Sequence, residues 1–253
     1  MIRLYSEGKS ARQVAEEIGK GYRERFVSTV LKLVGISNPE RRKFYWKGER
    51  NPRWNRPDLN PTPALAYLLG VYYGDASVDK RGSFRLSVTS KVFAESFRQA
   101  IEKIGLKPWR IVTYIQATPS YGDIPAHTST FYCTGIGSKA LAGWLKEMDL
   151  NSVKGFLSSN EMKREFLRGV YESEGTFSPK SQQIRISNTN LKLLNLCKTL
   201  LKDLGFKGIS IIVSRESSVV GGISRKTCYQ LYFGRIGQLK RFIDEVKPII
   251  KDK

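Results

Sequence analysis

Histidine and cysteine are scarce in this sequence. Its 253 residues include one histidine, His127, and three widely spaced cysteines, Cys133, Cys197 and Cys228. This number and spacing exclude a disulfide framework and a Cys/His zinc site, and they predict small core cysteines in an intracellular, reducing compartment. His127 is expected to be a surface residue in a loop rich in Pro, Ser and Thr. We therefore expect any catalysis by this chain to use carboxylates, basic side chains and a metal ion.

Long apolar runs and acidic residues are also in short supply. The longest apolar run, residues 64–73, is too short to span a bilayer, and charged residues interrupt the positions where a signal peptide would lie. The chain has 43 Lys and Arg against 23 Asp and Glu, a formal charge of +20. Such an excess favours a polyanionic partner, with nucleic acid as the leading class and an anionic membrane surface as the rival. We expect no membrane insertion.

Two apolar segments combine small residues with a terminal acid. The first, LAYLLGVYYGDA at 65–76, begins after the helix-start residues Thr62 and Pro63. Gly70 and Gly74 lie four residues apart, on one helix face, where the absence of Cβ atoms lets a second helix approach closely. Asp75 then lies at the negative end of the helix dipole, which is unfavourable without a nearby cation.

The second segment, FLRGVYESEG at 166–175, repeats this pattern. Gly169 and Ser173 have the same spacing, and Glu174 takes the position of Asp75. If the two helices pack along their small faces, their acids lie side by side, and a divalent metal ion is the simple remedy for their repulsion. For either segment alone, a buried core helix with a solvated terminal acid is the simpler interpretation; finding the pattern twice argues against it.

Both segments resemble the signature of the LAGLIDADG homing endonucleases, and the resemblance covers residues 62 to about 250. Ala76 departs from the usual glycine of that signature. The resemblance implies an α+β fold in which two αββαββα units form a pseudo-two-fold saddle of antiparallel sheets. It also implies that Asp75 and Glu174 are catalytic and hold Mg²⁺, with Mn²⁺ as a substitute, assisted by the carbonyls of Gly74 and Ser173.

Internal repetition supports two such units. Glu174 follows Asp75 by 99 residues, and RLSVT at 85–89 aligns with RISNT at 185–189. We expect a first repeat at 62–150, a linker at 151–160 and a second repeat at 161–253. Because one chain carries both motif helices, we expect a monomer.

The first 61 residues lie outside the repeats. Residues 1–36 resemble a helix-turn-helix, with helices expected at 2–7, 11–18 and 22–34; a plain helical hairpin is the alternative. Residues 37–61 form a basic, aromatic, proline-rich segment that could follow a DNA groove as an extended arm or serve as a solvated linker. The basic residues assigned to DNA there are Arg41, Arg42, Lys43, Arg50 and Arg53.

The polar faces of the expected strands carry candidate base-reading side chains, since Arg and Gln suit bidentate contacts to guanine and adenine. By alternation these are Arg85, Ser87, Arg110, Tyr114, Gln116, Tyr132, Arg185, Ser187, Gln230 and Tyr232, with Arg81, Arg215, Arg225 and Lys226 at turns. A solvated sheet face is the alternative for any one of them. The family also places basic groups near its acids, and the loose matches here are Lys91, Lys139 and Arg235.

The resemblance therefore implies a homing endonuclease, and both an intron-encoded and a free-standing gene remain open. The resemblance implies that it binds a long, asymmetric duplex DNA target and cleaves both strands by metal-dependent hydrolysis, leaving short 3′ overhangs. Two alternatives use the same basic surface: a non-cleaving DNA-binding regulator, and a maturase that folds intron RNA.

Overall fold

The computed structural model describes residues 4, 11–19, 27, 30, 57–118, 126–178, 181–220, 223–234 and 236–249. The chain divides into two compact units, Met1–Trp54 and Asn55–Lys253. In the first unit, helix α2 (Ala11–Ile18) has the range expected for the second helix of the predicted helix-turn-helix. Its Val14 and Ala15 are buried together with Val27. The expected recognition helix and the basic arm lie outside the described residues, apart from Val27, Val30 and residues 57–61.

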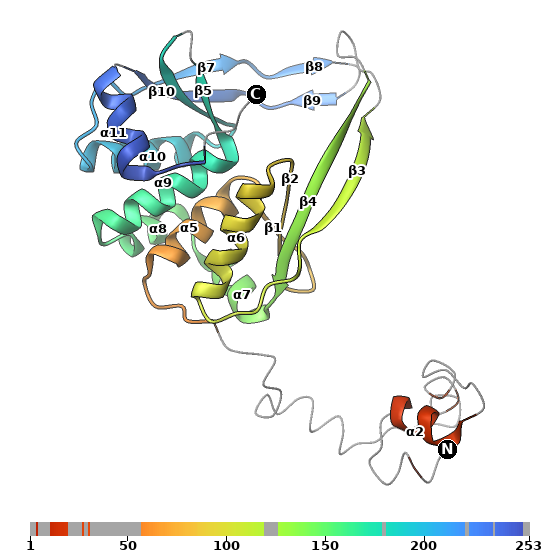
Figure 1. The fold of residues 1–253 in the computed structure, drawn as a ribbon. Helices are drawn as coiled ribbons and strands as arrows, with labels where there is room; N and C mark the ends of the chain where they lie inside the picture. The colour runs from red at the N-terminus through yellow and green to blue at the C-terminus, as the bar shows by residue number, and fades with distance from the viewer. Residues whose placement is uncertain are drawn as a thin grey trace. The chain divides into compact units, whose positions relative to one another are not determined.

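The second unit contains the predicted duplication. In the first repeat, α5 (Pro63–Tyr73) is followed by β1 (Ser77–Val78), β2 (Ser83–Val88), α6 (Lys91–Lys103), β3 (Val112–Thr118), β4 (His127–Gly137) and α7 (Lys139–Glu147). In the second, α9 (Asn160–Glu174) is followed by β5 (Gly175–Ser178), β6 (Gln183–Asn188), α10 (Leu191–Asp203), β7 (Ser210–Arg215), β10 (Cys228–Gly234) and α11 (Ile236–Val246). A small hairpin of β8 (Ser218–Val220) and β9 (Ile223–Arg225) lies between β7 and β10 in sequence (Figure 1).

Each repeat builds its own four-stranded antiparallel sheet. The strand orders, β1-β2-β4-β3 and β5-β6-β10-β7, are the same once the repeats are aligned. This confirms the predicted α+β fold class. Backbone conformation repeats as well, since Gly105 after α6 and Gly205 after α10 have φ angles of 80° and 81°. Both glycines end their helices in the left-handed region, where a residue without Cβ is favoured.

One face of each sheet packs on helices and the other is open. In β2, Phe84, Leu86 and Val88 are buried in the core, whereas Arg85 and Ser87 between them are exposed. In β6, Ile184 and Ile186 are buried, and Arg185 and Ser187 alternate with them. We call the face that carries Arg85 and Ser87, or Arg185 and Ser187, the open face of its sheet.

Three details differ from the sequence-based expectations. The expected linker at 151–160 contains a helix, α8 (Leu150–Phe156), because Asp149 caps it by accepting a hydrogen bond from the Ser152 amide at 2.7 Å. His127 is exposed, as expected, but begins β4 instead of lying in a loop. Of the three cysteines, only Cys197 is fully buried, and burial raises its pKa to about 12.

Among the described residues, no helix has the length and apolar character needed to cross a membrane.

Candidate functional site

The helices α5 and α9 lie backbone to backbone. A Cβ atom added to Gly70 would overlap the carbonyl oxygen of Phe166 and lie 2.9 Å from the amide nitrogen of Val170. A Cβ on Gly169 would overlap the carbonyl of Tyr67 in the same way. Glycine is therefore required at both positions, and the predicted close helix pair is present in the structure (Figure 1).

The same approach continues at the ends of the two helices. Gly74 follows the last residue of α5, and a Cβ there would overlap Ser173 and lie 3.5 Å from Cγ of Glu174. Asp75, the next residue, is exposed. Glu174 is the last residue of α9 and is half-buried. Because each acid is fixed to the end of one helix of a tight pair, the pair brings both carboxylates to one end of the interface.

Ala76, which stands where the second repeat has Gly175, fits without strain. Its φ angle is not in the left-handed region, and its amide donates to the carbonyl of Val71 at 3.0 Å. The last turn of α5 therefore widens rather than turning left-handed, so an alanine is tolerated. Its side chain is buried and belongs to the core.

The two acids have different surroundings. The Nδ2 amide of Asn188, at the end of β6, donates to Oε1 of Glu174 at 2.9 Å. The Asn188 side chain is itself oriented by the Asn190 amide, which donates to its Oδ1 at 2.8 Å. Val88 ends β2 at the corresponding position of the first repeat and has no such donor. One oxygen of Glu174 is therefore held by a hydrogen bond that has no equivalent at Val88.

The donor set at this end suits a hard cation. Carboxylates and main-chain carbonyls are oxygen ligands, and Mg²⁺ commonly takes one or two protein carboxylates together with substrate phosphates. Within the described part of the chain, no three His, Cys, Asp or Glu side chains gather closely enough to form a complete metal cage. An ion at Asp75 or Glu174 would need additional oxygen ligands from substrate or water.

Four of the predicted reading residues lie on the open face of the first sheet. Arg85 pairs with Asp79 at 3.0 Å and lies over the Trp109 ring. The hydroxyls of Ser87 and Tyr114 are 2.7 Å apart, and Gln116 follows on the same side of β3. Arg110 is exposed just before β3, and Arg81 is exposed in the turn between β1 and β2.

Tyr132 was predicted on this face, and that prediction is wrong. Its pairing with Val88 places it on the helix side of the sheet, where it packs against the core. Phe131, the preceding residue, occupies the open face instead and stacks on Tyr114 with 5.4 Å between ring centroids. Because Phe131 and Tyr132 are both aromatic, the alternating pattern of β4 does not show which of the two faces the core.

The four residues predicted to read bases in the second sheet all lie on its open face: Arg185, Ser187, Gln230 and Tyr232. Gln230 donates to Ser187 at 3.1 Å, and Tyr232 pairs across the strands with Arg185. Arg185 is held by Gln183 and Ser181. Three more predicted DNA-binding residues lie near the outer hairpin: Arg215 ends β7, Arg225 ends β9 and Lys226 is exposed beside it.

The two predicted catalytic cations that the structure describes lie toward opposite ends of the first sheet. Lys91 begins α6, just beyond the Ser87–Val88 end of β2, and is 3.7 Å from Glu95. Lys139 lies against Gly82, at the opposite end of β2. Arg235 lies outside the described residues. Of the two that the structure describes, only Lys91 is on the acid side of the first sheet.

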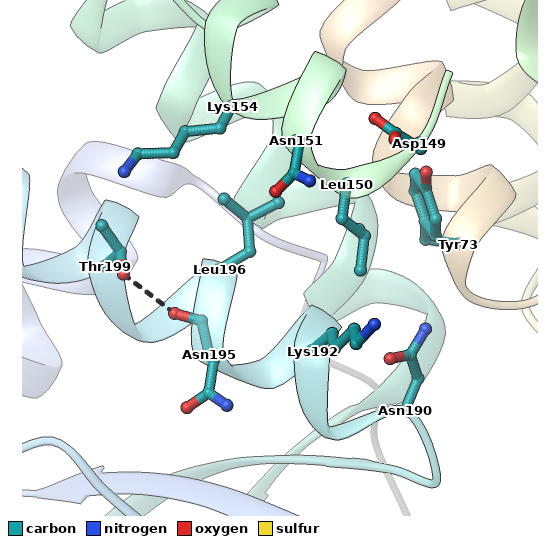
Figure 2. Close-up of a pocket in the computed structure, with 10 residues that line it drawn as sticks. All are labelled: Tyr73, Asp149, Leu150, Asn151, Lys154, Asn190, Lys192, Asn195, Leu196 and Thr199. Atoms are coloured by element: carbon teal, nitrogen blue, oxygen red, sulfur yellow. Dashed lines mark hydrogen bonds between the residues drawn. The ribbon is translucent and has the colours of Figure 1, made fainter. Parts of the chain in front are cut away.

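Sequence reasoning missed Asn188 and a neighbouring cleft. The cleft, of about 600 Å³, lies between α8 and α10 beside Tyr73, and Lys154 and Lys192 line it (Figure 2). Figure 2 shows the Lys192 side chain directed toward Asn190. The aligned pentapeptides contained the signal for Asn188, because Val88 and Asn188 are the pair whose polarity differs most.

A buried acid lies inside the helix pair. Glu172 is fully buried in α9; it accepts hydrogen bonds from the Tyr67 hydroxyl at 2.5 Å, from Arg168 at 2.9 Å and from the Ile249 amide at 3.1 Å. Burial, and then the charge of Glu172, raise the pKa of Tyr67 well above its usual value. Glu172 therefore has a structural place in the interface, distinct from that of the terminal acids.

Both a family model and a curated protein match this chain. Residues 161–247 match the model of the LAGLIDADG-like domain. The chain is 31% identical over 221 residues to the uncharacterized protein MJ0398 of Methanocaldococcus jannaschii, covering 82% of this chain and 76% of that protein.

Solved structures with a similar fold include full-length DUF199/WhiA from Thermatoga maritima. That likeness has a TM-score of 0.52 at 16% identity and covers 76% of this chain and 57% of that one. The structure of I-DmoI in complex with DNA and Mn is similar at a TM-score of 0.46 and 22% identity, over 74% of this chain and 97% of that chain.

Proposed function

Because this chain belongs to the LAGLIDADG family, we propose that it is a site-specific endonuclease that binds duplex DNA and hydrolyses one phosphodiester in each strand. The observation that carries the proposal is the retention of an acid at the end of both close-packed helices, Asp75 after α5 and Glu174 at the end of α9. A protein that only bound DNA would not need both carboxylates at one end of the interface, where they repel each other and the phosphates.

The hydrolysis is assigned to the residues at the ends of α5 and α9. Asp75 and Glu174, with the carbonyls of Gly74 and Ser173, would hold divalent cations against the scissile phosphates. When bound, Mg²⁺ or Mn²⁺ would lower the pKa of an attacking water molecule and stabilise the leaving oxygen. Asn188 would keep the Glu174 carboxylate in one orientation through its 2.9 Å hydrogen bond.

The open faces and the positive charge supply DNA affinity. Arg85, Arg185 and Gln230 lie on the open faces, where antiparallel strands could enter the major groove. The formal charge of +20 favours binding to phosphates, which also makes affinity sensitive to salt. Lys91 and Lys192 are the basic side chains that we assign to the acid end, in place of Lys139.

A cleavage and binding selection tests the proposal. The full chain is incubated with a randomised duplex library and Mg²⁺, and both cut ends and retained duplexes are sequenced. We expect recurrent cuts in both strands with short 3′ overhangs. Retention of a defined sequence without cutting would favour a DNA-binding regulator, and selective retention of structured RNA in a parallel pool would favour a maturase; either result overturns the nuclease assignment.

Paired substitutions connect the cleavage to this site. The double variant Asp75→Asn, Glu174→Gln should bind the selected target as the wild type does while cutting drops by several orders of magnitude. The matched control is Asp244→Asn, Glu147→Gln, because both of these acids are exposed and lie in α11 and α7. Asp79 and Glu172 are unsuitable controls, since both hold structure through several hydrogen bonds. Equal cutting by the two double variants would refute the site.

A further inference from the structure

Two aliphatic side chains occupy the same place on the two open faces. Val112 in β3 and Ile212 in β7 are 61% and 45% exposed, and they are 100 residues apart. Across the first sheet, Cys133 pairs with both Ser87 and Val112, so these three form one row. Across the second sheet, Gln230 pairs with both Ser187 and Ile212 in the same arrangement. Each row crosses three strands: it begins at Ser87 or Ser187 and ends at the aliphatic residue on the third strand.

The same two strands also carry exposed aliphatic side chains on the opposite side of each sheet, which serve as an internal comparison. Ile115 in β3 and Val213 in β7 are also exposed, at 72% and 52%, but they lie on the helix side of their sheets. Ile115 is out of phase with Val112, and Val213 shares its side with Ile211, which pairs with the buried Leu231. Strands β3 and β7 thus each expose a large aliphatic side chain on both sides of the sheet.

Hydrogen-bonding side chains lie beside the aliphatic residue on each open face. The hydroxyls of Ser87 and Tyr114 are 2.7 Å apart, and the Gln230 amide donates to Ser187. An aliphatic side chain in this setting satisfies no donor or acceptor on a base edge. What the major groove offers to such a side chain is the 5-methyl group of thymine, which protrudes from the base pair and is apolar. Contact removes both apolar surfaces from water.

We propose that Val112 and Ile212 each contact a thymine methyl group, at the same distance from the centre of cleavage in the two halves of the target. This inference rests on the proposed function, because it assigns part of the sequence preference of the same DNA-binding surface. The middle residue of the row differs between the repeats, Cys133 in one and Gln230 in the other. The target is therefore symmetric at the positions read by the aliphatic pair and asymmetric at the neighbouring positions.

Base analogues test the methyl contact directly. Starting from the sequence retained in the library selection, each thymine is replaced singly by deoxyuridine, which removes the methyl group and keeps every hydrogen-bonding group. We expect one position in each half, at equal distance from the cut, where binding weakens about fourfold, the effect of one buried methyl-sized group. Replacing that thymine by 5-methylcytosine, with guanine opposite, should restore part of the loss that unmodified cytosine causes.

Four single variants assign the effect to the residues. Val112→Ser and Ile212→Ser remove every side-chain methyl group, so they should abolish the difference between thymine and deoxyuridine, each in its own half of the target. Ile115→Ser and Val213→Ser are the matched controls on the helix side, and they should keep the difference in both halves. All four positions are solvent-exposed, so circular dichroism and thermal unfolding should show an unchanged fold.

The outcomes separate this inference from the function on which it rests. If the library gives no retained sequence, the proposed function fails. If a sequence is retained but thymine and deoxyuridine bind alike at every position, or if the control variants remove the difference as Val112→Ser does, the methyl contact is refuted while the DNA-binding function stands.

Discussion

Tyr73 and Glu172 occupy equivalent positions in the two repeats. Each forms a hydrogen bond to the main chain beyond the last helix of its repeat, Tyr73 as the donor and Glu172 as the acceptor. The Tyr73 hydroxyl donates to the carbonyl of Met148, just beyond α7, while Glu172 accepts from the amide of Ile249, just beyond α11. Each side chain therefore ties its motif helix to the segment that follows the last helix of its own repeat. One is a donor and the other an acceptor, so the duplication preserved the connection while the residue type changed.

Removing the buried carboxylate should destabilise the fold. Glu172→Ala leaves the Tyr67 hydroxyl and the Ile249 amide without this partner and takes from Arg168 the buried one of its two carboxylate partners. We expect the free energy of unfolding to fall by about 3 kcal/mol, as for other broken buried ion pairs. Urea denaturation measures it, with Glu161→Ala in the first turn of α9 as the control. An equal loss of unfolding free energy in the control would contradict a structural role for Glu172.

The helix pair should not tolerate a methyl group at its closest approach. Gly70→Ala and Gly169→Ala each direct a Cβ into the backbone of the facing helix, which cannot move aside as a side chain can. We expect each to lower the free energy of unfolding by about 3 kcal/mol or more.

Gly143→Ala is the contrasting variant, because Gly143 lies within α7 and a Cβ there meets nothing within 4 Å. It should raise stability by about 0.5–1 kcal/mol, the usual gain over glycine in a helix. Thermal unfolding of the three variants side by side should show this difference in sign, and a common sign would argue against the close packing of α5 and α9.

The turn before β6 contains a strained residue that the first repeat avoids. Gln182 has a φ of 47°, whereas Gly82, at the corresponding position, has 82°. A residue with a Cβ is strained in this region, so Gln182→Gly should stabilise the protein by about 0.5–1 kcal/mol. Gly82→Ala should do the opposite, since its Cβ would also lie 2.9 Å from Lys139. The shift of the unfolding midpoint in each variant gives the sign.

The hydrogen bond at Glu174 predicts unequal strand cleavage. Asn188→Val gives the second repeat the residue that the first has at Val88, and it removes the donor that holds one oxygen of Glu174. We expect cutting of one strand to slow by about 10–100-fold, as when groups that orient a metal ligand are removed, while the other strand is cut at the wild-type rate. End-labelling both strands separately measures this ratio. Asn195→Val, on α10, is the control, and equal slowing of both strands would mean a general structural defect.

The N-terminal region is assigned to affinity by its sequence alone. Deleting residues 1–56 removes Arg41, Arg42, Lys43, Arg50 and Arg53, which are predicted to bind phosphates. The slope of log affinity against log salt should flatten by about 0.9 for each phosphate that is no longer neutralised, while cutting at low salt and saturating protein continues. An unchanged slope would show that this region does not bind DNA.

Most of this fold could be predicted from sequence patterns, because the duplication makes each pattern occur twice in the sequence. Small residues at Gly70 and Gly169 predicted a helix pair that the structure contains, and the aligned strands gave two sheets of the same order. Alternation failed at Tyr132, where Phe131 and Tyr132 are both aromatic and periodicity cannot tell which of them faces the core.

What the sequence could not supply is the pairing of residues far apart in the chain. Nothing in the spacing of Glu172 marks it as a partner of Tyr67 and Ile249, because burial and pairing of an acid depend on which helix it meets. Lys139 looked suitable as a catalytic cation, but the register that pairs Ser83 with Gly137 carries it to the wrong end of β2.

Each sheet is made only of strands from its own repeat, whereas the α5–α9 interface is shared. This division sets different freedoms for the two copies after duplication. A strand of one sheet can change its side chains without a matching change in the other copy. At Gly70 and Gly169, in contrast, the backbone of each helix packs directly against the backbone of the other. Selection on the sheets can therefore act on one copy at a time, and selection on the helix pair acts on both copies together. Chimeras that join repeats of two relatives should keep the helix residues as a matched set and exchange the sheets freely.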